Sequence, residues 1–140
     1  MKLVDTNILV YAFDIESEHH IKAKEILKDG LKNSNIVLSS QNLLEFYSVA
    51  TRKIPVPLSP KDANEVINII FDTPEIMIIA PSLNCVRNAV KTSEKKNLKG
   101  ARIFDVVISE TMKENGIEVI LTEDNHFEKL GVYMDNPFVK

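Results

Sequence analysis

The chain has 140 residues, 44% of them hydrophobic, and a formal net charge of -3 at pH 7. This length and apolar content suit one packed domain over 1–140, and the net charge excludes a uniformly basic nucleic-acid-binding surface. A single cysteine, Cys85, excludes an internal disulfide and a zinc site built from several thiolates. The sequence shows no signal peptide and no apolar run of about 20 residues, so we expect a soluble cytoplasmic protein with no membrane partner.

The first third of the chain alternates between strand and helix signals. Short apolar runs predict strands at 2–5 and 35–40, and apolar residues at helical spacing predict helices at 6–13, 19–32 and 41–52. In the last of these helices most positions are apolar or small. We therefore expect most of its surface to be buried.

The middle of the chain opens with a loop and continues with a helix and a strand. The prolines in KIPVPLSP, 53–60, push the residues before them out of the helical region and predict the loop. Ser59 as a cap and Pro60 at the first helical position predict a helix that runs to about Phe71. The apolar run EIMIIA, 75–80, predicts the third strand.

Two more helices are predicted after the third strand. Ser82 caps a predicted helix that continues to about Lys96. Gly100 interrupts the chain before a further helix over 101–115, and Gly116 can close that helix in a left-handed cap. Both helices carry apolar residues at helical spacing, so each is expected to pack one face on the core.

The last strands are predicted at 118–122 (EVILT) and, as a fifth strand, at 132–134 (VYM). Strands that alternate with helices indicate the α/β class, with a central parallel sheet of four or five strands covered by helices on both faces. The sequence therefore predicts a three-layer α/β/α fold. Such sheets place ligands at the carboxyl ends of their strands.

Four carboxylates occupy unusual positions: Asp5, Glu45, Asp105 and Asp124. The first and last follow predicted strands, whereas the other two interrupt apolar helices. Each one singly has an ordinary explanation, as a helix cap or as part of a solvated polar stripe. Together they indicate a site for cations such as Mg²⁺ or Mn²⁺, because carboxylates without a counter-ion repel one another. Paired ions of this kind promote in-line phosphoryl transfer.

The four carboxylates lie in four short motifs, namely VDTNIL with Asp5, NLLEFYSV with Glu45, RIFDVVISETM with Asp105 and LTEDNHF with Asp124. In order, spacing and placement on strand, helix, helix and strand, these motifs resemble those of the PIN-domain ribonucleases, and among them the stand-alone VapC-type toxins. The resemblance covers nearly the whole chain. One position departs from the family pattern, because His126 stands where many relatives have a further Asp.

The resemblance implies a PIN-like fold and a divalent-metal-dependent endoribonuclease with Mg²⁺ or Mn²⁺ as its cofactor. It implies that Asp5 and Asp105 hold the main cation, and that Asp124 completes its shell or holds a second ion. Glu45 would bind directly or through water, so that these four residues are both metal-binding and catalytic. The residues that would orient the carboxylates through hydrogen bonds are Thr6, Asn7 and Thr122.

Basic residues gather just before the third motif, at Lys95, Lys96, Lys99 and Arg102. They predict a local patch that binds RNA phosphates, although an ordinary solvated helix face gives the same pattern. For a toxin, the resemblance further implies an antitoxin partner that blocks the acidic site, and a homodimer. Two alternatives stay open: a non-catalytic PIN-like module that binds RNA or protein, and a housekeeping RNA-processing nuclease without an antitoxin.

Overall fold

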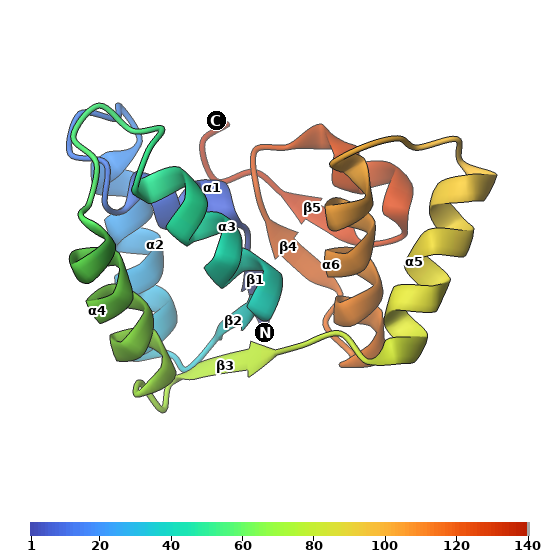
Figure 1. The fold of residues 1–140 in the computed structure, drawn as a ribbon. Coiled ribbons are helices and arrows are strands. Elements are labelled where there is room, and N and C mark those ends of the chain that lie inside the picture. Colours follow the sequence, from blue (N-terminus) through green and yellow to red (C-terminus); the bar gives the residue numbers. More distant parts are fainter. Residues whose placement is uncertain (140) are drawn as a thin grey trace.

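Five short parallel strands form one sheet at the centre of the structure (Figure 1). The computed structural model describes residues 1–139. The order along the sheet is β3-β2-β1-β4-β5, and each neighbouring pair is parallel. The strands span Lys2–Val4 (β1), Ile36–Ser39 (β2), Ile76–Ile79 (β3), Val119–Leu121 (β4) and Tyr133–Asp135 (β5). The strands predicted from the sequence are confirmed, the fifth included.

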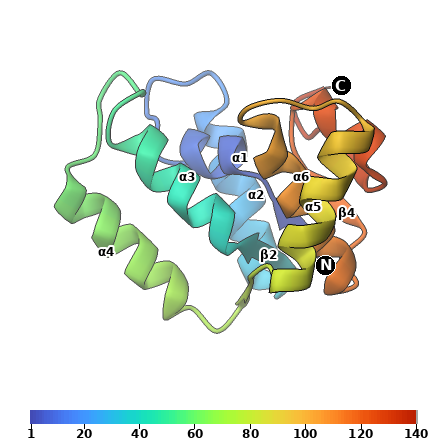
Figure 2. The ribbon, with the colours of Figure 1, turned by 45° about the vertical axis from the view of Figure 1, so that its right-hand side comes forward.

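Helices cover both faces of this sheet. Their bounds are Thr6–Tyr11 (α1), His20–Lys32 (α2), Ser40–Ala50 (α3), Pro60–Phe71 (α4), Leu83–Lys95 (α5) and Arg102–Glu114 (α6). Helices α1 to α4 lie on one side of the sheet, and α5 and α6 lie together on the other (Figures 1 and 2). A 3₁₀ helix, η1 (Asn125–Leu130), packs against α6 and β5.

Two hydrophobic cores follow from the alternation of side chains along the strands. Val4 of β1 and Leu38 of β2 belong to the core beneath α1 to α4. Leu3 and Val37, one position away on each strand, belong to the core beneath α5 and α6. Successive side chains of a strand point to opposite faces, so each central strand contributes to both cores. The predicted three-layer α/β/α architecture is therefore confirmed.

Capping residues begin and end the helices where the sequence predicts them. The Ser59 side chain accepts a hydrogen bond from the backbone of Asp62 at the start of α4, and Ser82 does the same for Cys85 in α5. Gly116, just beyond α6, has a φ of 70°, the left-handed conformation that closes a helix without strain at glycine. These local signals fix the ends of the helices on which the site residues lie.

Helix α3 is less buried than the sequence predicts. Leu43 and Phe46 are buried, but Leu44 is 69% exposed and Tyr47 is 39% exposed. The prediction was wrong because only one face of α3 meets the core, while apolar side chains also occupy its outer face. Glu45 consequently lies at the border between the two faces rather than inside a buried helix. Within residues 1–139, no helix combines the length and apolar character needed to cross a membrane.

Candidate metal centre

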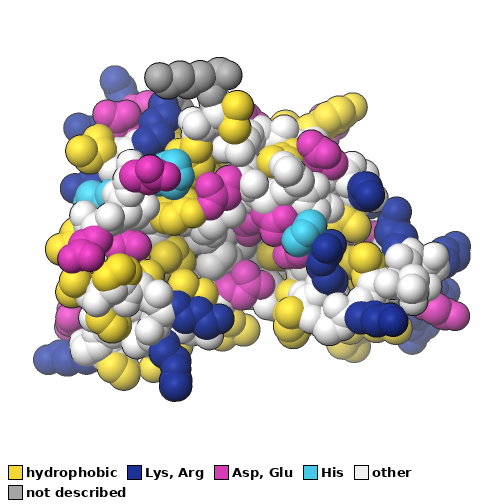
Figure 3. Space-filling view, turned by 90° about the horizontal axis from the view of Figure 1, so that it is seen from above, with side chains coloured by type: hydrophobic (Ala, Val, Ile, Leu, Met, Phe, Trp, Pro, Cys, Tyr) yellow, Lys and Arg dark blue, Asp and Glu magenta, His cyan; other side chains and the backbone are white. Residues whose placement is uncertain are grey.

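The four predicted carboxylates lie around one cavity at the carboxyl edge of the sheet. Asp5 directly follows β1, Glu45 lies on α3, Asp105 lies in the first turn of α6, and Asp124 follows β4. The cavity has a volume of about 340 Å³ and is lined by all four. Figure 3 looks down on this side of the molecule, where acidic side chains gather near the middle. The fold thus brings together residues that are up to 119 positions apart in the chain.

Asp5 is the most deeply buried of these acids, with 7% of its surface exposed. Its Oδ1 accepts a hydrogen bond from the backbone N–H of Thr6 at 2.8 Å, and its Oδ2 accepts one from the Thr122 hydroxyl at 2.7 Å. Burial raises the pKa of Asp5 to about 6. The two hydrogen bonds oppose this rise, whereas the nearby charges of Glu45 and Asp105 add to it. Asp5 therefore caps α1 and also lines the site.

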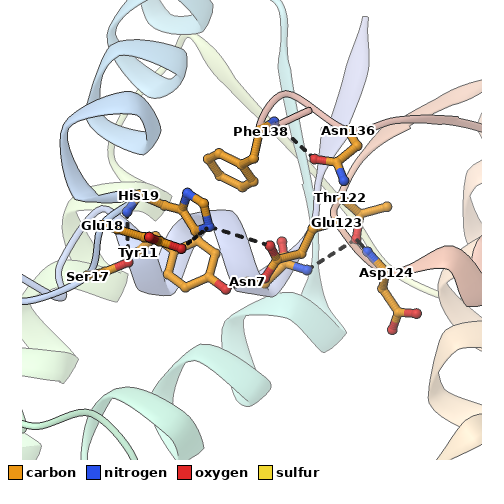
Figure 4. A network of polar contacts seen from close by, with 10 residues as sticks. All are labelled: Asn7, Tyr11, Ser17, Glu18, His19, Thr122, Glu123, Asp124, Asn136 and Phe138. Atoms are coloured by element: carbon orange, nitrogen blue, oxygen red, sulfur yellow. Dashed lines mark hydrogen bonds and ion pairs between the residues drawn. The ribbon is translucent and has the colours of Figure 1, made fainter. Parts of the chain in front are cut away.

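Thr122 connects three of the predicted residues through one hydroxyl group. Its hydroxyl donates a hydrogen bond to Asp5. The same oxygen accepts hydrogen bonds from Asn7 Nδ2 at 3.2 Å and from the backbone N–H of Asp124 at 3.0 Å. Thr122 is fully buried. Figure 4 shows Asn7 reaching from α1 toward Thr122 and Asp124. This chain of bonds holds the ends of β1 and β4 in register at the site.

Glu45 is held by hydrogen bonds to both of its carboxylate oxygens. Thr6 Oγ1 donates to Oε2 at 3.0 Å, and Gln41 Nε2 donates to Oε1 at 3.0 Å. Thr6 in turn accepts a hydrogen bond from Asn42 Nδ2 at 3.0 Å. The Asn42 side chain is fully buried and also forms a capping box with Ser39. The sequence reasoning missed Asn42, although the Ser-x-x-Asn spacing before α3 marks it as a capping residue.

Asp105 and Asp124 lie beside His126. The His126 Nδ1 atom is 2.9 Å from Asp124 Oδ1 and 3.8 Å from Asp105 Oδ2. Burial raises the pKa of Asp105 to about 6, and the charges of Asp124 and Glu45 contribute to the rise. The charges of His126 and Arg102 oppose this rise but do not cancel it.

The donor set fits a hard divalent cation. Among residues 1–139, no lysine or arginine lies within ion-pair distance of any of the four carboxylates. One ligand atom each from Asp105, Asp124 and His126 can be chosen so that all lie within 4.8 Å of one another. Asn7 Oδ1, beside the same cavity, is buried and has no hydrogen-bond partner within the described part of the chain. Oxygen-rich sites that lack a protein counter-ion are suited to Mg²⁺ or Mn²⁺.

Basic side chains lie along a groove that continues from the acidic cavity. Lys99 and Arg102 line a space of about 620 Å³ together with Glu45, Asp105 and Asp124. Lys53, in the loop after α3, lines the same space and was missed, because nothing in its local sequence distinguishes it from any other loop lysine. A neighbouring cavity of about 600 Å³ is lined by Lys96, Arg102 and Lys129. Lys95 is exposed and lies outside the linings of both.

A family model described as the PIN domain matches residues 2–133 of the 140-residue chain. The chain belongs to the PIN domain family. The resemblance seen in the four sequence motifs is thereby confirmed, and so is the fold that it implies. No curated protein matches the sequence significantly.

Solved structures with the same PIN fold have sequences that differ widely from this chain. VapC20 of Mycobacterium tuberculosis, described as a sarcin-ricin loop cleaving toxin, superposes with a TM-score of 0.76 at 15% identity, covering 94% of this chain and 96% of its own. VapBC2 of Rickettsia felis, solved with a promoter DNA fragment, gives a TM-score of 0.64 at 21% identity, with coverages of 96% and 97%. FitAcB of Neisseria gonorrhoeae gives 0.64 at 17% identity, with 99% of each chain covered.

An aromatic cluster borders the acidic cavity of this PIN domain. Tyr11 lines the cavity, and its hydroxyl donates a hydrogen bond to Glu123 (Figure 4). His19 stacks on Phe138 with ring centroids 4.1 Å apart, and Tyr11 meets the edge of this stack. No sequence signal marks this cluster, because Tyr11 has the spacing of an ordinary core residue. It attaches the segment after β5 to α1, next to the site.

Proposed function

We propose that this PIN domain is a divalent-metal-dependent endoribonuclease and that it acts as the toxin of a toxin–antitoxin pair. One observation carries the proposal: within residues 1–139, carboxylates from four separate segments converge on one cavity, and no lysine or arginine lies within ion-pair distance of them. Two of these acids have a pKa raised to about 6, mainly because burial disfavours their charged form and further because nearby carboxylates repel them. Metal-dependent phosphodiester cleavage is the chemistry best served by such a cluster.

The proposed cation ligands are Asp5, Asp105 and Asp124, with Glu45 binding directly or through water. A bound divalent cation supplies a Lewis acid that polarises a phosphodiester oxygen and makes a nearby water more nucleophilic. Hydrogen bonds within the protein position the proposed ligands. Thr122 fixes Asp5 and the backbone of Asp124, and Thr6 fixes Glu45 through a 3.0 Å hydrogen bond.

The proposed substrate is RNA, and its path is the groove beside the acids. Lys53 approaches this groove from the loop after α3, and Lys99 and Arg102 approach it from the start of α6. Phosphates bound by these side chains would lead the backbone across the carboxylates between them. The toxin role is supported by the fold likeness to VapC20, and by neighbours solved as VapBC and FitAB assemblies bound to DNA. From the same likeness we propose an antitoxin partner, a homodimer and a cytoplasmic location.

The test is cleavage of a mixed pool of structured RNA by the purified protein in Mg²⁺ or Mn²⁺, against a chelator. Asp5→Asn should lower the cleavage rate by at least about 100-fold, because it removes a direct ligand and even outer-shell partners contribute about 10–100-fold. Asp72→Asn is the matched control, since Asp72 is an exposed residue at the end of α4, on the opposite edge of the sheet. Its cleavage rate should equal that of the unmodified protein.

The same variants separate the alternatives. Growth arrest on expression in a bacterial host, reversed by Asp5→Asn, supports a toxin, whereas cleavage in vitro without growth arrest supports a housekeeping nuclease. If no metal raises the melting temperature and no RNA is cleaved, the nuclease proposal is refuted and a non-catalytic binding module replaces it.

A further inference from the structure

His126 is the one side chain near the carboxylates, within residues 1–139, that brings a nitrogen rather than an oxygen to the cluster of possible metal ligands. Its Nδ1 faces Asp124 Oδ1 at 2.9 Å and Asp105 Oδ2 at 3.8 Å. Ligands bound about 2.1 Å from a cation in octahedral geometry lie about 3 Å apart at adjacent positions. His126 Nδ1 and Asp124 Oδ1 therefore already have the spacing of adjacent ligands, and Asp105 offers an oxygen within 4.8 Å of both residues' ligand atoms.

The position of His126 is fixed by the structure around it. Its neighbour Phe127 is fully buried, and Leu130, one turn later in η1, is 6% exposed, so the 3₁₀ helix is anchored in the core beneath α6. The backbone N–H of His126 also donates to Asp124 Oδ1 at 2.9 Å. The backbone at His126 is thus held beside the two acids by contacts that do not depend on a cation.

The contacts of Asp105 also suit a cation held between this carboxylate and His126. The structure shows, within residues 1–139, one ion-pair partner for this carboxylate and no hydrogen-bond donor. Asp5 and Glu45 differ, because each accepts hydrogen bonds on both oxygens. His126 Nδ1 lies 3.8 Å from this carboxylate and 2.9 Å from that of Asp124. A cation at this point would meet two carboxylates and an imidazole, rather than oxygen atoms alone.

We propose that His126 Nδ1 is a further protein ligand of the cation, beside Asp105 and Asp124, and that it makes the site favour Mn²⁺ and later transition metals over Mg²⁺. This inference rests on the proposed metal-dependent function and specifies which cation the site takes. Imidazole is a good ligand for first-row transition metals, whereas Mg²⁺ strongly prefers oxygen and water. An aspartate at this position would instead keep the site all-oxygen.

The test is electron spin-echo modulation of Mn²⁺ bound to the metal-stripped protein, which detects a directly coordinated ¹⁴N nucleus. The chain has 3 histidines, so a His19→Asn/His20→Asn double variant leaves His126 as the sole imidazole. We expect ¹⁴N modulation in the unmodified protein and in this double variant, and its loss in His126→Asn. Mn²⁺ affinity should fall by about 10-fold or more in His126→Asn, at least the loss seen when outer-shell partners are removed.

Competition between metals gives a second readout. His126→Asp should let Mg²⁺ displace Mn²⁺ at a concentration lower by about 10-fold or more than in the unmodified protein, because it restores an oxygen ligand. Since the His126 side chain is 43% exposed, these variants should fold, which a melting curve checks. Mn²⁺ bound without ¹⁴N modulation overturns the inference while the metal-dependent function stands. No Mn²⁺ binding at all overturns both.

Discussion

At Asp5 one side chain combines a structural role with a buried charge. It caps α1 and lies almost entirely inside the protein, so its ionised form loses solvation that the unfolded chain retains. The pKa of this carboxyl is about 6 in the folded protein, against an ordinary value of 3.8. Between these two values the folded state binds more protons than the unfolded state, so this group's contribution to stability decreases as pH rises.

We predict that replacing Asp5 with Asn stabilises the metal-free protein increasingly as pH rises. The stability difference between Asp5→Asn and the unmodified chain should grow by up to about 3 kcal/mol from about pH 4 to about pH 7.5, since one pKa unit corresponds to about 1.36 kcal/mol. Urea unfolding in chelator across this range measures it. Saturating Mn²⁺ at the upper pH should stabilise the unmodified chain more than the Asp5→Asn variant. If the unfolding free energies of the two proteins change in parallel with pH, burial does not raise the pKa of Asp5.

At the level of elements, the start of α3 is joined to the β1–α1 junction by one side chain. Asn42 Oδ1 accepts hydrogen bonds from the backbone and hydroxyl of Ser39, and its Nδ2 reaches Asp5 at 3.5 Å and Thr6 at 3.0 Å. The helix cap and the site thus share a residue. The position of Glu45, one turn further along α3, depends on the same interactions.

We predict that Asn42→Ala weakens both folding and metal binding. It should lower the free energy of unfolding by about 2–3 kcal/mol, because it removes a cap and leaves buried polar groups unpaired. Mn²⁺ affinity should fall with it, as measured by titration of the folded variant.

The control for this prediction is Ser59→Ala, which removes a similar cap from α4, away from the site. It should cost about 1 kcal/mol of stability and leave Mn²⁺ affinity unchanged. Equal affinity losses in the two variants would show that metal binding follows general stability rather than the hydrogen bonds of Asn42.

Across the whole molecule, acidic and basic side chains are unevenly distributed, so basic residues cluster locally although the net charge is -3. Acidic side chains gather near the centre of the face in Figure 3, and basic ones lie beside and around them. Lys53 and Lys99 line the groove from the side of α3 and the side of α6. A local field of this kind binds a phosphate backbone even on an acidic protein.

We predict that Lys53→Glu and Lys99→Glu each weaken RNA binding and flatten its salt dependence, whereas Lys95→Glu changes neither. All three substitutions alter the net charge equally, so the comparison isolates position in the groove. The slope of log affinity against log salt should become shallower by about 0.7 for each phosphate of single-stranded RNA that the variant no longer neutralises. Fluorescence anisotropy in an Asp5→Asn background, where RNA stays intact, measures it. Equal effects at all three lysines would exclude the groove as the path.

The sequence predicts this fold well where the signals are local, and less well where they depend on packing. Ser59 and Pro60 locate the start of α4 because a cap and a proline act within one turn. The outer face of α3 was misjudged, since exposed Leu44 and Tyr47 look like core residues in a one-dimensional pattern. Lys53 could not be found, because its place on the groove results from the path of a loop in space.

The two hydrophobic cores on opposite faces of the sheet have a consequence for motion. Asp5 and Glu45 are attached to the layer of α1 to α4, and Asp105 belongs to the layer of α6 on the other face. A cation held between them would fasten the two layers at the carboxyl edge of the short strands that join them. In the metal-free protein each layer could open as its own cooperative unit, and amide hydrogens of α3 and α6 would exchange independently. Occupancy of the site would then slow exchange in both helices together.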